Sequence, residues 1–157
     1  MKYLVSGREM KNWEKKAMEA QKIPSLLLME RAALAVVEEL LNGKYDLKKI
    51  LIACGTGNNG GDGFAIARLM MQKGYDTHVC LVGAMDKLSV DAKQQLEMYQ
   101  AISGKFVTAP AYHEYTVIVD AIFGIGCNRD ITGIAAEVIG SINETNAQVI
   151  AVDVPSG

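Results

Sequence analysis

The sequence lacks the features that several large classes of protein require. Its 157 residues contain no continuous apolar run of the roughly 18 residues that a membrane span needs. The start, MKYLVSGREMKNWEKK, has no apolar core of a signal peptide. There are two histidines, no C-x-x-C pair and no spacing typical of zinc ligands. The net charge is −2, which gives no electrostatic case for nucleic acid or an anionic membrane surface.

The cysteines also exclude a disulfide framework, because there are only three. Cys54 and Cys80 lie inside apolar runs, so we expect both to be buried as small hydrophobic side chains. Cys127 lies in a predicted loop, where a reactive thiol is the alternative to a structural role. The length suits one domain with a real core. We expect a cytoplasmic protein.

Two helices are predicted before any strand. Residues 6–9 form an S-x-x-E capping box, which predicts a helix from about residue 7. Pro24 ends this helix, and Ser25 is the predicted cap of the next. The second helix, LLLMERAALAVVEELL, runs to residues 42–43. It is apolar on nearly all sides, so we expect the domain and a partner subunit to cover it.

From residue 48 onward, short apolar runs alternate with helical segments. We predict strands over residues 48–54, 77–83, 104–109, 115–124 and 147–154, and helices over residues 64–74, 89–103 and 133–143. This alternation predicts an α/β fold, a three-layer αβα sandwich with a Rossmann-like doubly wound parallel sheet after the two N-terminal helices. The last strand leads straight into V-P-S-G, so we expect the domain, residues 1–157, to be truncated at its C-terminus.

Three unusual turns follow strands of the predicted sheet: Gly55–Gly63, Gly124–Asp130 and Asp153–Gly157. In doubly wound sheets, ligands bind outside the carboxyl ends of the strands where the strand order reverses. With the usual order 3-2-1-4-5, that point lies between the first and fourth strands, and the fifth adds its turn beside them. The three turns are therefore predicted to line one crevice.

Each turn also has a purely structural interpretation. The glycine cluster could form only a tight turn, and Asn58 and Asn59 could adopt left-handed turn conformations. Asp120 and Asp153 could cap helices or tie loops together. A binding site is favoured because all three turns would otherwise carry such residues by accident.

The first turn fits G-x-G-x-x-G at Gly55–Gly60, but the rest of the dinucleotide fingerprint is missing. The second strand ends in Val82-Gly83-Ala84, and the nearest acid, Asp86, comes about three residues late for the ribose hydroxyls. Asp62 carries a negative charge where a helix N-terminus would favour a pyrophosphate. No G-K-[ST] follows for a Walker loop, and neither histidine is placed for a Ser-His-Asp triad. A NAD-linked oxidoreductase is therefore a disfavoured alternative.

The motifs GTGNNGGDGFAIARLM, VDAIFGIGCNRD and VIAVDVPSG, in this order, closely resemble the YjeF N-terminal domain family, the NAD(P)H-hydrate epimerases. The segment LLLMERAA resembles that family's N-terminal helix. The resemblance implies an isomerase that interconverts the R and S forms of hydrated NADH and NADPH. It also implies a homodimer to which the N-terminal helices contribute. In bacteria such a domain is often fused to an ATP- or ADP-dependent dehydratase.

The resemblance further implies roles for individual residues. Ile125 and Cys127 depart from the family's usual residues, a small polar residue and a leucine, and we expect mild effects. The segment from Gly124 to Asp130 would bind phosphate. Asn59, Asp120 and Ser156 would bind a potassium ion. The substrate site would comprise Asn58, Asn59, Gly60, Gly61, Asp62, Gly124, Ile125, Gly126, Cys127, Asn128, Arg129, Asp130 and Asp153.

Asp153 and Asp62 are the candidate catalytic residues. Loss of the hydroxyl beside the ring nitrogen, followed by return of water to the other face, would invert the reacting carbon. A carboxylic acid would protonate the leaving oxygen, and a carboxylate would stabilise the cation. Ring opening is a second route that the sequence leaves open. A non-catalytic nucleotide-binding or dimerisation scaffold, as in enhancer-of-decapping proteins, is the alternative function.

Overall fold

The computed structural model describes residues 6–127 and 130–157, without the side chains of residues 8, 11 and 14. Its centre is a parallel five-stranded sheet with the order β3-β2-β1-β4-β5, which is the predicted order. The strands are β1 (Ile50–Cys54), β2 (Thr77–Leu81), β3 (Lys105–Phe106), β4 (Val117–Ala121) and β5 (Gln148–Ala151). The third strand has two residues and is shorter than the strand predicted over residues 104–109.

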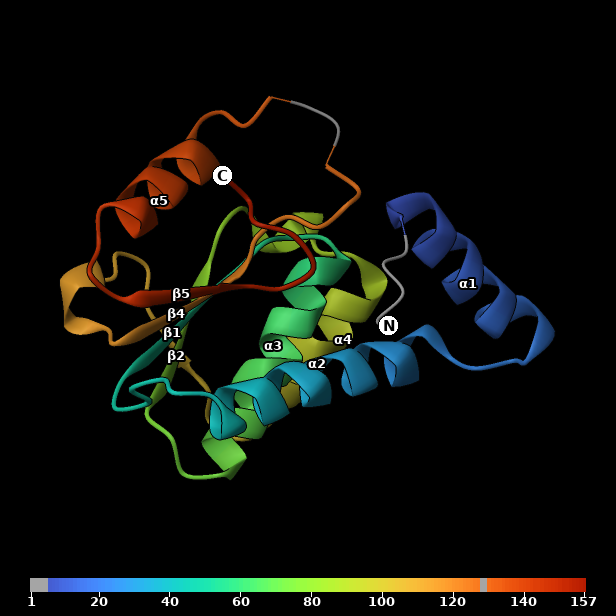
Figure 1. The fold of residues 1–157 in the computed structure, drawn as a ribbon, viewed down its shortest axis with the longest axis horizontal. Coiled ribbons are helices and arrows are strands. Elements are labelled where there is room, and N and C mark those ends of the chain that lie inside the picture. Colours follow the sequence, from blue (N-terminus) through green and yellow to red (C-terminus); the bar gives the residue numbers. More distant parts are fainter. Residues whose placement is uncertain (1–5, 128–129) are drawn as a thin grey trace.

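Helices cover both faces of the sheet and complete the predicted αβα sandwich. On one face lie α2 (Ser25–Asn42), α3 (Asn58–Gln72) and α4 (Val90–Ala101), and on the other lies α5 (Ile134–Asn143) (Figure 1). Alternate residues of β1 serve the two cores: Ile52 packs with the three-helix side and Leu51 with the α5 side. Cys54 and Cys80 are buried and free, as predicted, and burial raises the pKa of both thiols.

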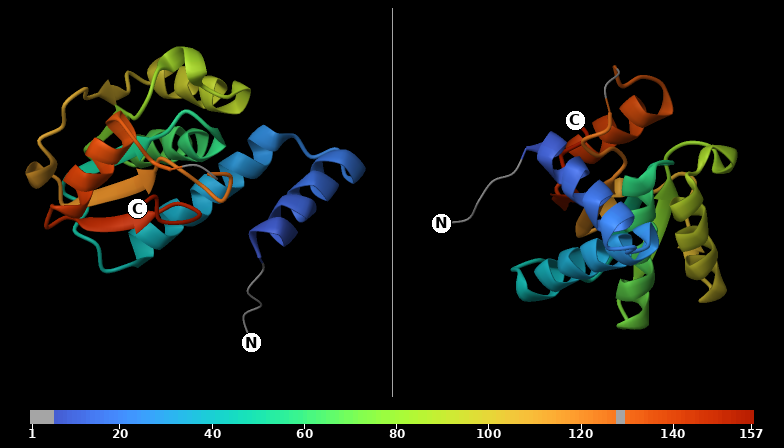
Figure 2. Two further views of the ribbon diagram at one scale, coloured as in Figure 1. Left: turned by 90° about the horizontal axis from the view of Figure 1, so that it is seen from above. Right: turned by 90° about the vertical axis from the view of Figure 1, so that its right-hand side faces the viewer.

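The two N-terminal helices differ in how their first turns are capped. Helix α1 (Gly7–Ala20) begins with the predicted capping box and stands apart from the body (Figure 2). Helix α2 begins at Ser25 itself, after Pro24 as the cap residue, so the prediction that Ser25 caps the helix is wrong. A proline fits this position because it has no N–H to be satisfied and its fixed φ suits a helix entrance.

Helix α3 starts six residues earlier than the prediction from residue 64, at Asn58. Asn58 and Asn59 are therefore helical, and the interpretation of both as left-handed turn residues is wrong. The glycines that hid this helix are needed for close packing. A Cβ on Gly60 would overlap the carbonyl oxygen of Gly55, and one on Gly61 would lie 2.7 Å from the Met29 methyl carbon.

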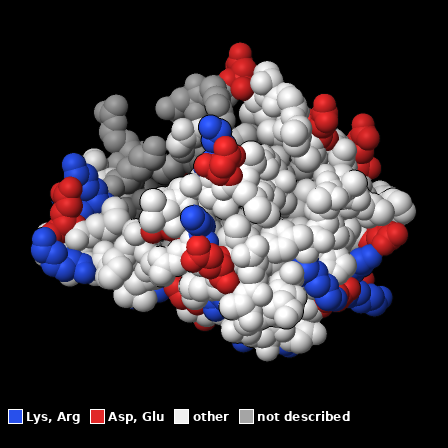
Figure 3. All heavy atoms as spheres, turned by 180° about the vertical axis from the view of Figure 1, so that it is seen from behind, with Lys and Arg blue, Asp and Glu red and all other residues white. Residues whose placement is uncertain are grey.

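The described surface carries both signs of charge. On the face in Figure 3, acidic and basic side chains are interspersed around a broad uncharged area. Among the described helices, none has the length and apolar character that a membrane crossing demands.

The close approach at Gly60 yields a stability prediction. Gly60→Ala should lower the free energy of unfolding by about 1–3 kcal/mol, because the added methyl group forces the turn after β1 to move. Gly140→Ala is the matched control, since it is also a helical glycine but its Cβ would meet open space. It should raise stability by up to about 1 kcal/mol. Urea denaturation measures both, and equal effects in the same direction would contradict this packing.

Candidate functional site

The three predicted turns follow adjacent strands at the carboxyl edge of the sheet. Strand β4 lies between β1 and β5, and Asp120 pairs in register with Ala53 on one side and Ala151 on the other. All three strands are parallel, so the segments that follow them leave the same edge together. The topology therefore confirms the predicted convergence of the glycine turn, the segment after β4 and the D-V-P-S-G turn.

The backbone N–H and C=O groups of Phe123 join the three segments by hydrogen bonds. The side-chain amide of Asn59 donates to the Phe123 carbonyl oxygen at 2.9 Å. The Phe123 N–H donates to the hydroxyl oxygen of Ser156 at 3.0 Å. Both bonds connect elements far apart in sequence, the start of α3 and the turn after β5. The Phe123 side chain plays no part in them, so no sequence motif could have indicated this role.

A buried carboxylate anchors the third turn. Asp120, the fourth residue of β4, accepts hydrogen bonds from the Ser156 hydroxyl at 2.7 Å and the Ser156 N–H at 2.8 Å. It also accepts from the N–H of Ile122 at 3.1 Å. Both Asp120 and Ser156 are buried. Buried carboxylates need such donors, because desolvation without them is costly. Asp120 therefore ties the turn after β5 to the end of β4.

A second acid, in the turn after β5, accepts a hydrogen bond from the segment after β4. The Asp153 carboxylate accepts the N–H of Ile125 at 2.7 Å. A Cβ on Gly124 would lie 2.6 Å from the Asp153 Oδ2 and 3.6 Å from the Cβ of Asn59. A side chain at position 124 would therefore force the Asp153 carboxylate to move, whereas the distance to Asn59 is an ordinary van der Waals contact. Asp153 is exposed and has a φ of 71°, a left-handed conformation that non-glycine residues adopt rarely and mostly at constrained sites.

The first turn of α3 adds a third polar face. Asn58 and Asp62 are four residues apart, and Asn59 and Asp62 are three apart, so all three lie on neighbouring positions of the helix surface. Asp62 is half-buried. Asn58 accepts a hydrogen bond of 2.6 Å from the hydroxyl of Ser89, the N-cap of α4. Ser89 was predicted only as the start of a helix, and its place in the chain gave no sign of this contact.

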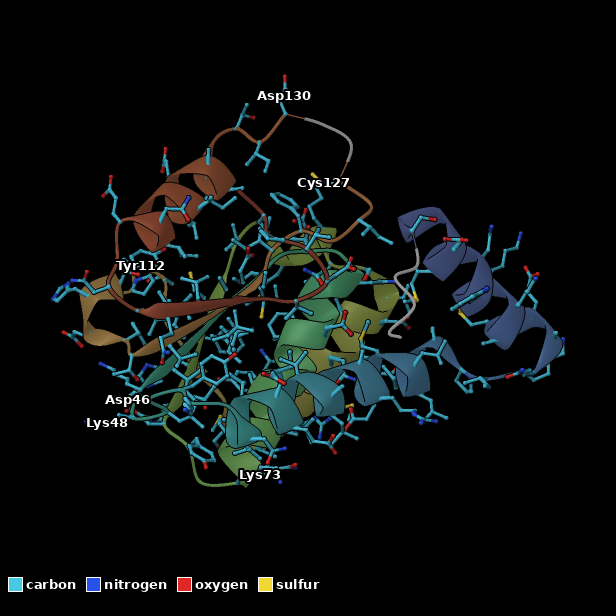
Figure 4. The ribbon with its side chains drawn as sticks, viewed as in Figure 1. Asp46, Lys48, Lys73, Tyr112, Cys127 and Asp130 are labelled. Atoms are coloured by element: carbon cyan, nitrogen blue, oxygen red, sulfur yellow. The ribbon has the colours of Figure 1, made fainter. Side chains whose placement is uncertain are left out.

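The described residues include only part of the rest of the predicted phosphate loop. Asn128 and Arg129 lie outside the described residues. Cys127 is half-buried, and its N–H donates to the Gly124 carbonyl oxygen at 3.0 Å, which closes a turn. Asp130 is exposed and points away from the body of the molecule (Figure 4). The described structure thus brings Gly124 and Ile125 to the crevice and leaves Asp130 at the outer end of the loop.

Several oxygens of the crevice can accept further contacts. The described residues contain no group of three or more His, Cys, Asp or Glu side chains suited to a metal ion. Asn59 donates through its nitrogen and so retains its carbonyl oxygen as an acceptor. The Ser156 hydroxyl accepts one hydrogen bond and retains a second lone pair. One carboxylate with neutral oxygens suits a weakly charged, oxygen-seeking cation better than zinc.

The described surface has two hollows, one at the opposite edge of the sheet from the crevice and one beside it. One, of about 670 Å³, is at the amino edge of the sheet and is lined by Asp46, Tyr112 and the end of α5 (Figure 4). Burial raises the pKa of Tyr112 to about 12, so the phenol stays protonated. The other, of about 150 Å³, is lined by Asp120, α5 and the D-V-P-S-G turn. The crevice remains the better candidate site. Among the described residues, polar side chains from three turns converge only there, at the carboxyl edge of the sheet.

Several known proteins are similar to this chain in sequence. The chain is 41% identical over 155 residues to the NAD(P)H-hydrate epimerase of Oenococcus oeni, covering 98% of this chain and 74% of that protein. It is 42% identical over 158 residues to the enzyme of the same name from Weissella koreensis, covering 98% of this chain and 70% of the relative. It also matches 32% of the bifunctional NAD(P)H-hydrate repair enzyme Nnr of Moorella thermoacetica at 38% identity, over 99% of this chain.

A solved structure agrees with the fold. The crystal structure of yeast ynu0 superposes with a TM-score of 0.78 at 27% identity, covering 99% of this chain and 72% of that one. The family model described as YjeF-related protein N-terminus matches residues 25–157, which include all three turns of the crevice. The chain therefore belongs to the YjeF-related N-terminal domain family.

Proposed function

We propose that this protein is an isomerase that interconverts the R and S forms of hydrated NADH and NADPH. The proposal rests on one observation: hydrogen bonds join the three turns and hold the Asp153 carboxylate beside the predicted phosphate loop. The names of the relatives from Oenococcus and Weissella support the reaction. The bifunctional relative supports a function in the repair of the same hydrates, because that longer chain is named as a repair enzyme with two activities.

The chemistry assigns Asp153 as the acid–base group. Its carboxylate is exposed, and the Ile125 N–H holds one of its oxygens in place. The other oxygen can exchange a proton with the hydroxyl on the reacting carbon. Asp62 supplies a second negative charge on the adjacent helix face, which would stabilise a cationic ring after the hydroxyl leaves. The glycines at positions 60, 61 and 124 leave room for the nucleotide close to the backbone.

Asp153→Asn tests this assignment. The variant should fold normally, because an amide oxygen can still accept the Ile125 N–H. Its turnover should fall by about 100-fold or more, as expected for loss of a general acid–base group. The assay follows R/S exchange by chromatography in an acid-treated NADH mixture. Asp86→Asn, at an exposed acid of the connection after β2, is the matched control and should behave like the unaltered protein.

Three other results would contradict the proposal. Near-normal turnover of Asp153→Asn would refute the acid–base role. Tight binding of the hydrates without exchange by the unaltered protein would favour the non-catalytic scaffold. Hydride transfer would favour an oxidoreductase.

We propose potassium as the resident ion of the site, with Asn59, Asp120 and Ser156 as ligands. These residues fit such an ion because they offer oxygens with a single formal negative charge. When bound, the ion would supply positive charge next to the loop that receives phosphate. The Phe123 backbone already links Asn59 to Ser156, and Ser156 is bonded to Asp120, so the ion would reinforce an existing arrangement.

Comparison of potassium with sodium at equal ionic strength tests the ion. The unaltered protein should be more active and should melt at a higher temperature in potassium chloride, because a ligand that binds only the native state stabilises it. Asp120→Ala should abolish both differences. Equal activity and equal melting temperatures of the unaltered protein in the two salts would refute the potassium site.

We propose a homodimer formed through α1 and α2. One stripe of α2 is buried against the sheet: Met29, Ala33, Val37 and Leu40. A second stripe, Leu27, Leu34 and Leu41, recurs every seven residues and is 50%, 40% and 36% exposed. Helix α1 projects beyond the N-terminal end of α2 (Figure 2) and carries Trp13, which is 54% exposed. A second copy would present the same apolar stripe, so that a two-fold arrangement would cover both.

Leu34→Glu should convert the dimer to a monomer, because it places a charge in the centre of this stripe. Analytical ultracentrifugation measures the mass, and circular dichroism confirms that the variant is folded. Val90→Glu, at a valine of α4 that is 84% exposed, is the control and should remain dimeric. A monomeric unaltered protein at tens of micromolar would refute the interface.

The cysteines support a cytoplasmic location. Cys54 and Cys80 are buried without a disulfide partner, which suits a reducing compartment.

A further inference from the structure

Ser89 lies at the junction of the glycine turn, α3 and α4, and its N–H and hydroxyl groups make hydrogen bonds to all three. Its N–H donates to the Thr56 carbonyl oxygen at 2.8 Å, and its hydroxyl oxygen accepts the N–H of Ala92 at 3.2 Å. The hydroxyl then contacts Asn58 Oδ1 at 2.6 Å. An N-cap serine needs only the bond to its own helix. The contact with Asn58 is additional and joins α4 to the first turn of α3.

The polarity of this contact follows from chemistry. A hydroxyl has one proton to donate, and the Ser89 hydroxyl already accepts from Ala92. A separation of 2.6 Å is typical of an O–H···O bond, whereas N–H···O bonds centre near 2.9–3.0 Å. Ser89 therefore donates to the amide oxygen of Asn58. The two N–H groups of that exposed amide are left for other partners.

The neighbouring asparagine is fixed the opposite way. Asn59 uses its nitrogen to donate to Phe123 and keeps its oxygen available. Two successive residues thus present opposite groups, donors from Asn58 and an acceptor from Asn59. The donors of Asn58 lie beside backbone N–H groups of the helix start, which have no intrahelical acceptor. Such a combination suits an acceptor oxygen of a bound nucleotide.

We propose that Ser89 is a positioning residue, whose hydroxyl fixes the Asn58 amide with its N–H donors available to an acceptor oxygen of the substrate. This inference rests on the proposed epimerase function for its substrate, but not for the geometry. Ser89 acts through Asn58, so its loss should affect substrate binding more than the chemical step.

Ser89→Gly is the informative variant, because glycine retains most of the capping strength of serine but has no hydroxyl. Its KM for the hydrates should rise about tenfold, the factor expected for one oriented hydrogen bond, while kcat and the melting temperature change little. Ser89→Thr keeps a hydroxyl and should restore KM. In an Asn58→Ala background, Ser89→Gly should cause no further rise. An unchanged KM in Ser89→Gly, or an additive effect in the double variant, would overturn the proposal.

ADP-ribose locates the acceptor oxygen, since it carries the diphosphate without the nicotinamide. Weaker competition by ADP-ribose against Ser89→Gly supports a contact with the diphosphate. Unchanged competition with a raised KM supports a contact with the nicotinamide half.

A measurement without substrate separates this inference from the proposed function. In the unaltered protein, NMR relaxation should show an ordered Asn58 side-chain amide, and in Ser89→Gly the same group should be mobile on the picosecond-to-nanosecond timescale. Equal mobility in both proteins would overturn the role of Ser89 whatever the activity. A protein that shows the expected mobility change but no R/S exchange would refute the epimerase and leave the positioning geometry in place.

Discussion

The site depends on the hydrogen bonds made by the backbone N–H and C=O groups of Phe123. Its carbonyl oxygen holds the start of α3 through Asn59, and its N–H holds the turn after β5 through Ser156. Ser156 in turn is fixed by the buried carboxylate of Asp120. The parallel sheet brings the three turns to one edge, but strand order alone does not set distances of a few ångströms. These bonds do, and all of them connect segments that lie 33 or more residues apart.

This arrangement explains why acids stand beside a loop that resembles a phosphate site. Asp120 is buried and accepts hydrogen bonds from three donors inside the protein, and its remaining lone pair suits the potassium ion proposed above. Asp153 is exposed and is held by one donor at a strained backbone position. The two acids have different surroundings and therefore different roles. The first stabilises the turns, and the exposure of the second suits the acid–base role proposed for it.

Much of the fold was predictable from the sequence, since alternating apolar runs and helices restrict a chain of this length to few topologies. The start of α3 was not, because three glycines in N-N-G-G-D-G lower helix propensity. Packing overrides that propensity at Gly60, where the backbone of Gly55 leaves no room for a side chain. The roles of Phe123 and Ser89 escaped prediction because one acts through its backbone and the other through a contact 31 residues away.

The most direct test of the central claim is a titration of the isotopically labelled protein with hydrated NADPH, followed through its backbone amide resonances. The three joined turns predict that the shifted resonances belong to residues 58–62, 124–127 and 153–157, and that those around the hollow at the amino edge, near Tyr112 and Asn146, remain in place. Shifts concentrated at the amino edge, or confined to a single turn, would contradict the account.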